Sequence, residues 1–255
     1  MSDSPETPDQ STPTGSELLE LRDVVAGYIA GVDILQGSTM HVSTGEMVGI
    51  IGPNGAGKST LIKAVFGLVP IRSGTIRLAE SDITGTPGFE LVKLGVGYVP
   101  QVRNVFGSLS VEENLRMGAF LRPHEFATRR DQVFDLFGVL AERRTTRAEL
   151  LSGGQRQVLA MGRALMMEPS LLLLDEPSAG LSPAMQDEVF ERITEIRSSG
   201  VSILIVEQNA YKALRVCDRG YVLDQGSVAY TGTGTELIND PKVIDLYLGS
   251  LARKH

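Results

Sequence analysis

A glycine-rich stretch, GIIGPNGAGKST, contains residues whose types and spacing point to phosphate chemistry. Residues 52–59 match G-x-x-x-x-G-K-[ST], with an apolar run (MVGII) before them and a helix-favouring run (TLIKAVFGL) after them. In such a loop, backbone N–H groups converge on phosphate oxygens in front of the positive end of the following helix. We expect nucleotide contacts from Gly52, Pro53, Asn54, Gly55, Ala56, Gly57, Lys58, Ser59 and Thr60.

The lysine and the backbone of this loop should contribute comparably to phosphate binding. Each charge-assisted backbone hydrogen bond contributes roughly 1.5–3 kcal/mol. A Lys58 ammonium about 4 Å from a phosphate charge contributes up to ~4 kcal/mol at an effective dielectric of about 20. The Ser59 hydroxyl is of the type that binds Mg²⁺ in this motif. A glycine-rich turn that ends in a solvated lysine is the simpler alternative, and the strand–loop–helix context speaks against it.

Two adjacent acids follow four leucines in LLLLDEP, at residues 171–177. The leucines predict a buried strand, and two carboxylates at its end are costly unless a cation or a nucleotide uses them. Asp175 suits the coordination shell of Mg²⁺, and Glu176 suits a general base that polarises an attacking water. A plain strand-to-turn transition is the alternative interpretation.

The apolar runs predict the elements that position these groups. SLLLLDEP and VSILIVEQN are continuous apolar strands, each followed by helix-forming sequence, as in a parallel sheet covered on both faces. Shorter β-type runs between residues 18 and 77 (LLELRDVVAGY, STMHVSTGEMVGII, SGTIRLA) predict a small antiparallel layer, and the last of them resembles a hairpin at a sheet edge. Residues 111–149 have helical spacing with many arginines, which predicts a helical insertion.

The composition narrows the class of protein. The 255 residues are 42% hydrophobic with a formal net charge of −7, so a general nucleic-acid binder, which would need a basic face, is not expected. One cysteine, Cys217, allows no internal disulfide. Residues 1–16 are polar and rich in Ser, Thr and Pro, which predicts a disordered tail and no signal peptide. Because no run reaches the roughly 20 apolar residues of a membrane helix, any work at a membrane would be that of a peripheral subunit.

The segment LSGGQRQ, at residues 151–157, identifies a family by its place between the glycine-rich loop and LLLLDEP. With that order of motifs, the chain resembles the ATP-binding subunits of ABC transporters. The resemblance implies an α/β P-loop NTPase of ABC type, with a mostly parallel core sheet, an antiparallel β layer and an inserted helical subdomain over about 101–150. It covers about residues 17–250 and implies a single ABC ATP-binding domain over residues 17–255, with ATP and Mg²⁺ as ligands.

In this family, ATP is sandwiched between the P-loop of one subunit and the LSGGQ motif of another. The resemblance therefore gives the second motif a role in trans, where a helix N-terminus makes an anion site. Its residues here are Ser152, Gly153, Gly154 and Gln155. An ordinary helix N-terminus capped by serine is the alternative for this motif alone.

Other roles carry over position by position. Tyr28 matches the aromatic residue that stacks on adenine, and Gln101, in GYVPQ, matches the glutamine that contacts Mg²⁺ and senses the γ-phosphate. With Ser59 and Asp175, Gln101 completes the implied metal site. The segment SAGLS, at residues 178–182, corresponds to the loop between the two active sites, although Ser182 stands where many relatives carry aspartate.

The strand ILIVEQN, at residues 203–209, departs from the family pattern. Most ABC ATPases carry a histidine that contacts the γ-phosphate where this chain has Gln208. The implied catalytic set is therefore Glu176, Lys58, Gln208 and Gln101. Glutamine can donate and accept hydrogen bonds but never titrates, so Gln208 is expected to position groups. Glu207 and Asn209 are equally consistent with a polar strand end and a helix N-cap.

A glutamine at that position, with VFGSLSVEENLRMGAF and the ending VIDLYLGSL, is similar to the shorter ATP-binding subunit of branched-chain amino-acid importers. The resemblance implies an ATPase on the cytoplasmic face of the membrane that energises uptake of such amino acids. Relatives that import urea, amides or other small solutes share these motifs. The implied partners are integral-membrane permease subunits, a second ATP-binding subunit (a sister chain or a second copy) and, indirectly, a solute-binding protein.

Three other classes of protein are alternatives to an importer subunit. A soluble ABC-type ATPase of repair or translation would carry long insertions, zinc-binding cysteines or a second cassette, none of which the sequence contains. A GTPase switch would carry an N-K-x-D motif for guanine and has no use for LSGGQ. A regulatory cassette without activity is conceivable from Ser182 and Gln208, but the intact Lys58, Asp175 and Glu176 argue against it.

Overall fold

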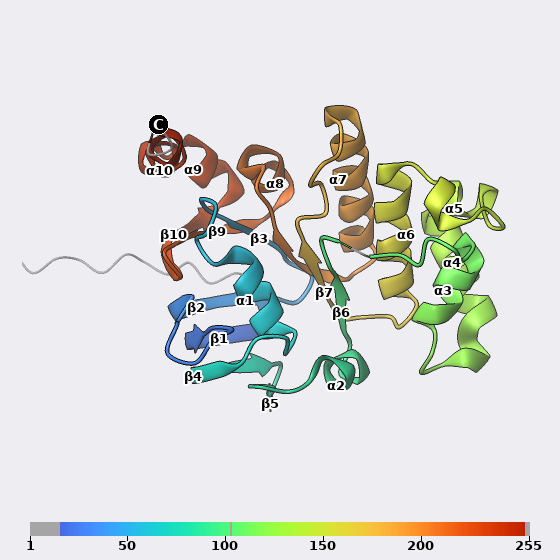
Figure 1. The fold of residues 1–255 in the computed structure, drawn as a ribbon, viewed down its shortest axis with the longest axis horizontal. Helices are drawn as coiled ribbons and strands as arrows, with labels where there is room; N and C mark the ends of the chain where they lie inside the picture. Colours follow the sequence, from blue (N-terminus) through green and yellow to red (C-terminus); the bar gives the residue numbers. More distant parts are fainter. Residues whose placement is uncertain (1–15, 103, 253–255) are drawn as a thin grey trace, which may run out of the picture.

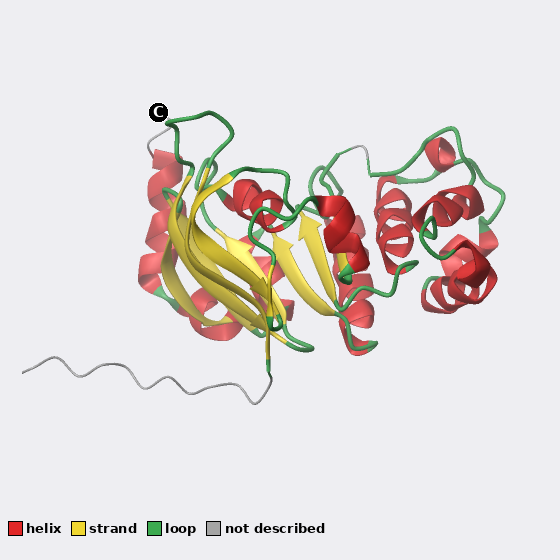
Figure 2. Ribbon diagram, turned by 90° about the horizontal axis from the view of Figure 1, so that it is seen from below, coloured by secondary structure: helices red, strands yellow, loops and turns green. Residues whose placement is uncertain are grey.

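The computed structural model describes residues 16–102 and 104–252. The tail expected over residues 1–16 lies outside these residues except for Ser16. Two sheets and a group of helices make up the described chain (Figures 1 and 2). The strands are β1 (Glu17–Ala26), β2 (Leu35–Ser43), β3 (Met47–Ile51), β4 (Ile71–Leu78), β5 (Ser81–Asp82), β6 (Val96–Val99), β7 (Leu171–Asp175), β8 (Ser202–Val206), β9 (Arg219–Asp224) and β10 (Ser227–Thr233).

The core sheet has the strand order β10-β9-β3-β8-β7-β6, and every neighbouring pair is parallel except β10 with β9. The second sheet, β2-β1-β4-β5, is antiparallel throughout. The mostly parallel core and the antiparallel layer predicted from the sequence are therefore both confirmed. The SGTIRLA segment lies in β4, which pairs with β1 on one side and forms the expected edge hairpin with the short β5 on the other.

Strands β7 and β8 show why the apolar runs do not alternate with polar residues. Leu172 and Leu174 pack into a core on one face of the sheet, while Leu171 and Leu173 pack into a second core on the other face. In β8, Ile203 and Ile205 belong to the first core, and Leu204 and Val206 belong to the second. A strand that is buried on both faces needs an apolar side chain at every position.

Helices pack on both faces of the core sheet, and a further group of helices lies beyond one end of it. Helix α1 lies between the two sheets and contacts β1, β7 and β8 (Figure 1). The helices are α1 (Lys58–Val65), α2 (Gly88–Lys93), α3 (Val111–Gly118), α4 (Phe126–Leu136), α5 (Gly138–Glu142), α6 (Gly153–Leu165), α7 (Pro183–Ser198), α8 (Ala210–Val216), α9 (Gly234–Asn239) and α10 (Pro241–Ala252), with 3-10 turns η1 (Pro123–Glu125) and η2 (Ala148–Leu150). Helices α3 to α6 gather at one end of the molecule, beyond β6 and β7 (Figure 1).

Two runs that the sequence presents as continuous are divided in the structure. The run STMHVSTGEMVGII crosses from β2 to β3, which belong to different sheets, through a turn in which Gly45 has a φ of 76°. The helical run after residue 126 breaks between α4 and α5 at Phe137, whose backbone leaves the helical region and whose side chain is buried. Tertiary packing overrides the local pattern at both places. Within the described residues, no helix combines the length and the apolar character needed to cross a membrane.

Candidate functional site

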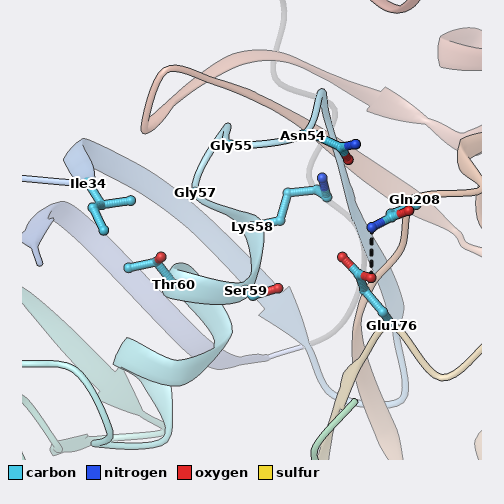
Figure 3. Close-up of a pocket in the computed structure, with 9 residues that line it drawn as sticks. All are labelled: Ile34, Asn54, Gly55, Gly57, Lys58, Ser59, Thr60, Glu176 and Gln208. Carbon is cyan, nitrogen blue, oxygen red and sulfur yellow. Dashed lines mark hydrogen bonds between the residues drawn. The ribbon is translucent and has the colours of Figure 1, made fainter. Parts of the chain in front are cut away.

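A cavity of about 440 Å³ opens at the carboxyl ends of β3, β7 and β8. This edge is where open α/β sheets bind ligands, because loops and helix N-termini converge there. Its lining residues come from four places in the chain (Figure 3): the residues are Ile34, Asn54, Gly55, Gly57, Lys58, Ser59, Thr60, Glu176 and Gln208. The cavity thus brings together the glycine-rich loop, the acid after β7 and the carboxamide after β8.

The glycines of the loop are required by its path. Gly52 has a φ of 152°, and a Cβ added there would lie 2.2 Å from the carbonyl oxygen of Leu223. Gly57, with a φ of 100°, is the N-cap of α1 and turns the chain into the helix. Both positions favour glycine because they adopt backbone conformations that are strained for other residues. At these two positions the path of the loop therefore requires backbone without a side chain.

Lys58 is buried at the base of this loop. Its Nζ donates hydrogen bonds to the carbonyl oxygens of Gly52 (2.9 Å) and Pro53 (3.1 Å). Burial lowers the pKa of Lys58, and the nearby carboxylates of Glu176, Glu207 and Asp175 act in the opposite direction. The ammonium group thus lies against the start of the loop that is expected to bind phosphate, as Figure 3 shows.

Glu176 is held by two side-chain amides from distant parts of the chain. Its Oε2 accepts a hydrogen bond from Nε2 of Gln101 at 2.7 Å and another from Nε2 of Gln208 at 3.0 Å (Figure 3 draws the second). Only 5% of Glu176 is exposed, and its φ of 48° is left-handed, which is uncommon for a residue with a side chain. The carboxylate is therefore fixed in direction at the edge of the cavity.

Asp175 has a different environment from its neighbour. It is 2% exposed, and its Oδ2 lies 3.3 Å from the Tyr98 hydroxyl, which donates to it, and 3.8 Å from Nζ of Lys63. Its Oδ1 is buried without a hydrogen-bond partner. Burial raises the pKa of Tyr98, and the Asp175 charge adds to this shift. A buried carboxylate oxygen without a partner is the kind of atom that a bound cation would satisfy.

The LSGGQ segment begins α6 and forms a capping box. The Ser152 hydroxyl accepts a hydrogen bond from the backbone N–H of Gln155, and the Gln155 side chain accepts one from the backbone N–H of Ser152. Gly153 is the first residue of the helix, and Gly154 is buried against Met185 of α7. None of these residues lines the cavity, and α6 lies apart from α1 along the length of the molecule (Figure 1).

Comparison with known proteins decides the family. A family model described as ABC transporter matches residues 35–179. This chain belongs to the ABC transporter family. It is 44% identical to BraG of Pseudomonas aeruginosa, a high-affinity branched-chain amino acid transport ATP-binding protein, over 89% of this chain and 98% of that protein.

Further comparisons agree with this assignment. The chain is 41% identical to LivF of Archaeoglobus fulgidus, a probable branched-chain amino acid transport ATP-binding protein, over 88% of this chain and 95% of that one. An ATP-binding cassette of an ABC transporter, solved in its ADP conformation, superposes with a TM-score of 0.82 at 29% identity, covering 91% of this chain and 99% of the other. The predicted α/β P-loop fold of ABC type is confirmed, and the protein is an ATPase of this family.

Several residues chosen from the sequence lie outside the cavity lining. Tyr28 is 53% exposed and does not line it, and Gly52, Pro53 and Ala56 contribute to the loop behind its surface. Ile34, in contrast, lines the cavity although the motifs did not indicate it. An isolated isoleucine before a strand carries no chemical signal, so only the fold could reveal it.

The polar residues at the ends of β7 and β8 have separate partners. Asn209 is the N-cap of α8, because its Oδ1 accepts a hydrogen bond from the backbone N–H of Lys212 at 3.2 Å, which confirms the capping interpretation. Ser182, where many ABC ATPases carry aspartate, is the N-cap of α7. Glu207 is 1% exposed and accepts hydrogen bonds from backbone N–H groups, among them that of Ser178 at 2.9 Å.

Proposed function

We propose that this chain is the ATP-hydrolysing subunit of an importer for branched-chain amino acids or a similar small solute, with Glu176 as the general base. The observation that carries the proposal is the convergence of Gln101 and Gln208 on Oε2 of Glu176, at the edge of the cavity lined by Lys58 and its loop. The similarity to transport proteins named for branched-chain amino acids supports the choice of solute.

The chain's own residues supply the steps of hydrolysis. Loop N–H groups and Lys58 bind and orient the β- and γ-phosphates. Glu176 accepts a proton from the attacking water, while the amides of Gln101 and Gln208 keep its carboxylate aimed at that water. Because a carboxamide does not titrate, Gln208 orients groups near the γ-phosphate and transfers no proton.

The residues present fit a magnesium ion. The unpartnered Oδ1 of Asp175 and the hydroxyl of Ser59, at the start of α1, are hard oxygen ligands of the type that Mg²⁺ prefers. Gln101 donates a hydrogen bond to Glu176, the residue that follows Asp175. The described residues contain no cluster of three or more His, Cys, Asp or Glu that could hold a metal, so phosphate oxygens and water would complete the shell. When bound, Mg²⁺ would neutralise charge that develops on the phosphates.

The position of the LSGGQ segment supports action in pairs. Ser152 and the N-terminus of α6 lie away from the cavity of their own chain. A nucleotide that they contact would therefore be one bound in the cavity of another subunit. The second subunit is a sister chain or a second copy of this one. In the assembly we propose, permease subunits bind the helical region around 101–150 at the cytoplasmic face of the membrane, and a solute-binding protein delivers the solute from the other side.

Replacement of Glu176 tests this function. Glu176→Gln keeps the size of the side chain and removes the base, so we expect hydrolysis to fall about 10²–10⁴-fold while ATP binding persists. Glu191→Gln, on an exposed position of α7, is the matched control and should hydrolyse ATP at the parental rate. Parental hydrolysis by Glu176→Gln would refute the role of the base.

A second measurement tests the transport role. Purification of the full-length chain from membranes should recover integral-membrane partners, and vesicles containing that complex should accumulate labelled leucine or valine only with ATP. Uptake of urea or amides instead would contradict the proposed solute but not the proposed mechanism of ATP hydrolysis. Active ATPase that recovers no membrane protein would contradict the proposed importer.

A further inference from the structure

Glu207 is a buried acid beside the site that the proposed mechanism does not use. It directly follows β8, is 1% exposed and does not line the cavity. Its Oε1 accepts a hydrogen bond from the backbone N–H of Ser178 at 2.9 Å, and its Oε2 accepts one from the backbone N–H of Gln208 at 3.2 Å. Burial raises the pKa of Glu207, so the protein keeps this carboxyl group at a cost in solvation.

Both hydrogen bonds reach segments that carry site residues. Ser178 lies two residues after Glu176, and the backbone N–H of Glu176 itself donates to the carbonyl oxygen of Val206 at 2.9 Å. The end of β8 therefore binds the chain at Glu176 and again at Ser178. Glu176 has its left-handed φ of 48° between these two attachments. Such a conformation persists only where surrounding contacts hold it, and the Glu207 carboxylate is one of those contacts.

A second connection joins the same segments through α7. Nε2 of Gln186 donates to the carbonyl oxygens of Ser178 (3.4 Å) and Leu181 (3.3 Å). The Nδ2 group of Asn209 donates to Oε1 of Gln186 at 3.4 Å. These bonds are longer than those of Glu207, so the carboxylate provides the tighter connection between residues 176–181 and 207–209.

We propose that Glu207 is a positioning residue for ATP hydrolysis, whose carboxylate holds the backbone of Ser178 and Gln208 and thereby fixes Glu176 against the Gln208 amide. The inference rests on the proposed role of Glu176 as general base. Glu207 does not line the cavity, so it acts through the residues that its carboxylate holds. Its effect is on the alignment of the 3.0 Å contact between Gln208 and Glu176.

Glu46 provides the comparison for a buried acid with a purely structural role. It is 9% exposed and accepts a hydrogen bond from the backbone N–H of Ser43 at 2.8 Å, but it also pairs with Nε of Arg219 at 2.9 Å. It directly precedes β3, at the end of that strand opposite the glycine-rich loop. Within the described residues no cation lies within 4.0 Å of the Glu207 carboxylate, which accepts hydrogen bonds from backbone N–H groups and interacts with the Lys58 ammonium only at longer range.

The test compares Glu207→Ala and Glu207→Gln with the control Glu46→Gln in the full-length chain. Steady-state hydrolysis of Mg-ATP gives kcat and KM, and hydrogen–deuterium exchange reports on the backbone of residues 176–182. Because misplacement of a catalytic group by about 1 Å can cost ~100-fold, we expect Glu207→Ala to lower kcat by about 10- to 100-fold with KM little changed. Glu207→Gln keeps one acceptor oxygen and should fall between Glu207→Ala and the parent.

Exchange provides a readout that is independent of turnover. Amide exchange over residues 176–182 should accelerate in both Glu207 variants, and Glu46→Gln should leave both kcat and this exchange unchanged even if its Tm falls. If Glu207→Ala does not fold, Glu207→Gln decides alone: a lower kcat with faster exchange supports the proposal, and parental values overturn it.

Measuring Glu176→Gln in the same assay separates two failures. A slow Glu176→Gln beside parental Glu207 variants overturns the positioning role and leaves the proposed function standing. A Glu176→Gln variant that hydrolyses ATP at the parental rate removes the proposed function, and the role of Glu207 with it. Loss of ATP binding in Glu207→Gln without a change in kcat would also overturn the proposal, because it would place the effect on binding.

Discussion

Replacing Gln208 with histidine puts a titrating ring where the chain carries a neutral amide. The Nε2 atom of Gln208 lies 3.0 Å from Oε2 of Glu176, and an imidazole nitrogen has a similar reach from the backbone. In the parent, the Gln208 amide does not titrate, so its side of this contact does not change with pH. In Gln208→His it becomes a charged pair once the ring binds a proton, so the ring should bind that proton more tightly than a free histidine does.

The distance sets the size of the effect. Opposite unit charges about 3 Å apart attract by roughly 5.5 kcal/mol at an effective dielectric of about 20. The Gln208 side chain is exposed, so solvent screens much of this energy. We therefore expect a rise of about one to three pKa units above the ordinary value near 6.5, which is the usual range for a histidine beside a carboxylate.

An NMR titration measures this directly. The chain has only three histidines of its own, His41, His124 and His255, so the new ring resonance is found by comparison with the parent. The double variant Glu176→Gln/Gln208→His is the control, and its ring should titrate near 6.5 because the charge is gone. A ring in Gln208→His that titrates at or below 6.5, or a shift that persists in the double variant, would refute the geometry of this contact.

Two further predictions concern capping and pH. Ser152→Ala and Ser110→Ala each remove a capping box, from α6 and α3 respectively, and each should cost about 1 kcal/mol of stability in urea unfolding. Only Ser152→Ala should also slow ATP hydrolysis, and equal rates in the two variants would count against a role in trans. Because burial raises the pKa of Glu207, its carboxyl stabilises the fold most below the ordinary value of 4.5 and loses that contribution as pH rises through the folded value. The stability of Glu207→Gln relative to the parent should therefore increase from pH 4.5 upward, and a decrease would contradict the assigned cause.

Much of the site follows from residues that are neighbours in sequence. The loop from Gly52 to Thr60 carries its own turn chemistry, and the apolar runs before Asp175 and Glu207 predict two buried strands of one sheet. Since the carboxyl ends of neighbouring parallel strands share an edge, the meeting of the loop, Glu176 and Gln208 could be expected from the sequence. Local pattern and strand direction are sufficient for this part of the fold.

Contacts between distant residues could not be predicted in the same way. Gln101 and Glu176 are 75 residues apart, and only the pairing of β6 with β7 brings them within 2.7 Å. The sequence did not show whether Glu207 or Asn209 caps the following helix, because a carboxylate and a carboxamide can each accept a hydrogen bond from a backbone N–H group. In the structure, Asn209 is the N-cap of α8. The division of β2 from β3, which belong to different sheets, depends on the turn at Gly45 and on the pairing of each strand with distant partners, which no run of side chains records.

The three acids near Lys58 differ in the hydrogen bonds that they already accept, and this difference supports the roles proposed for them. Oε2 of Glu176 accepts from two side-chain amides, each oxygen of Glu207 accepts from a backbone N–H group, and neither acid has a buried oxygen without a partner. Asp175 does have one, and among the described side chains no other buried nitrogen or oxygen lacks a partner. A cation that enters with the nucleotide therefore gains most at Asp175, where it satisfies an atom whose burial otherwise costs about 1–3 kcal/mol or more. At Glu176 the same cation would compete with the two hydrogen bonds that Oε2 accepts, which supports the proposed role of that carboxylate toward the water.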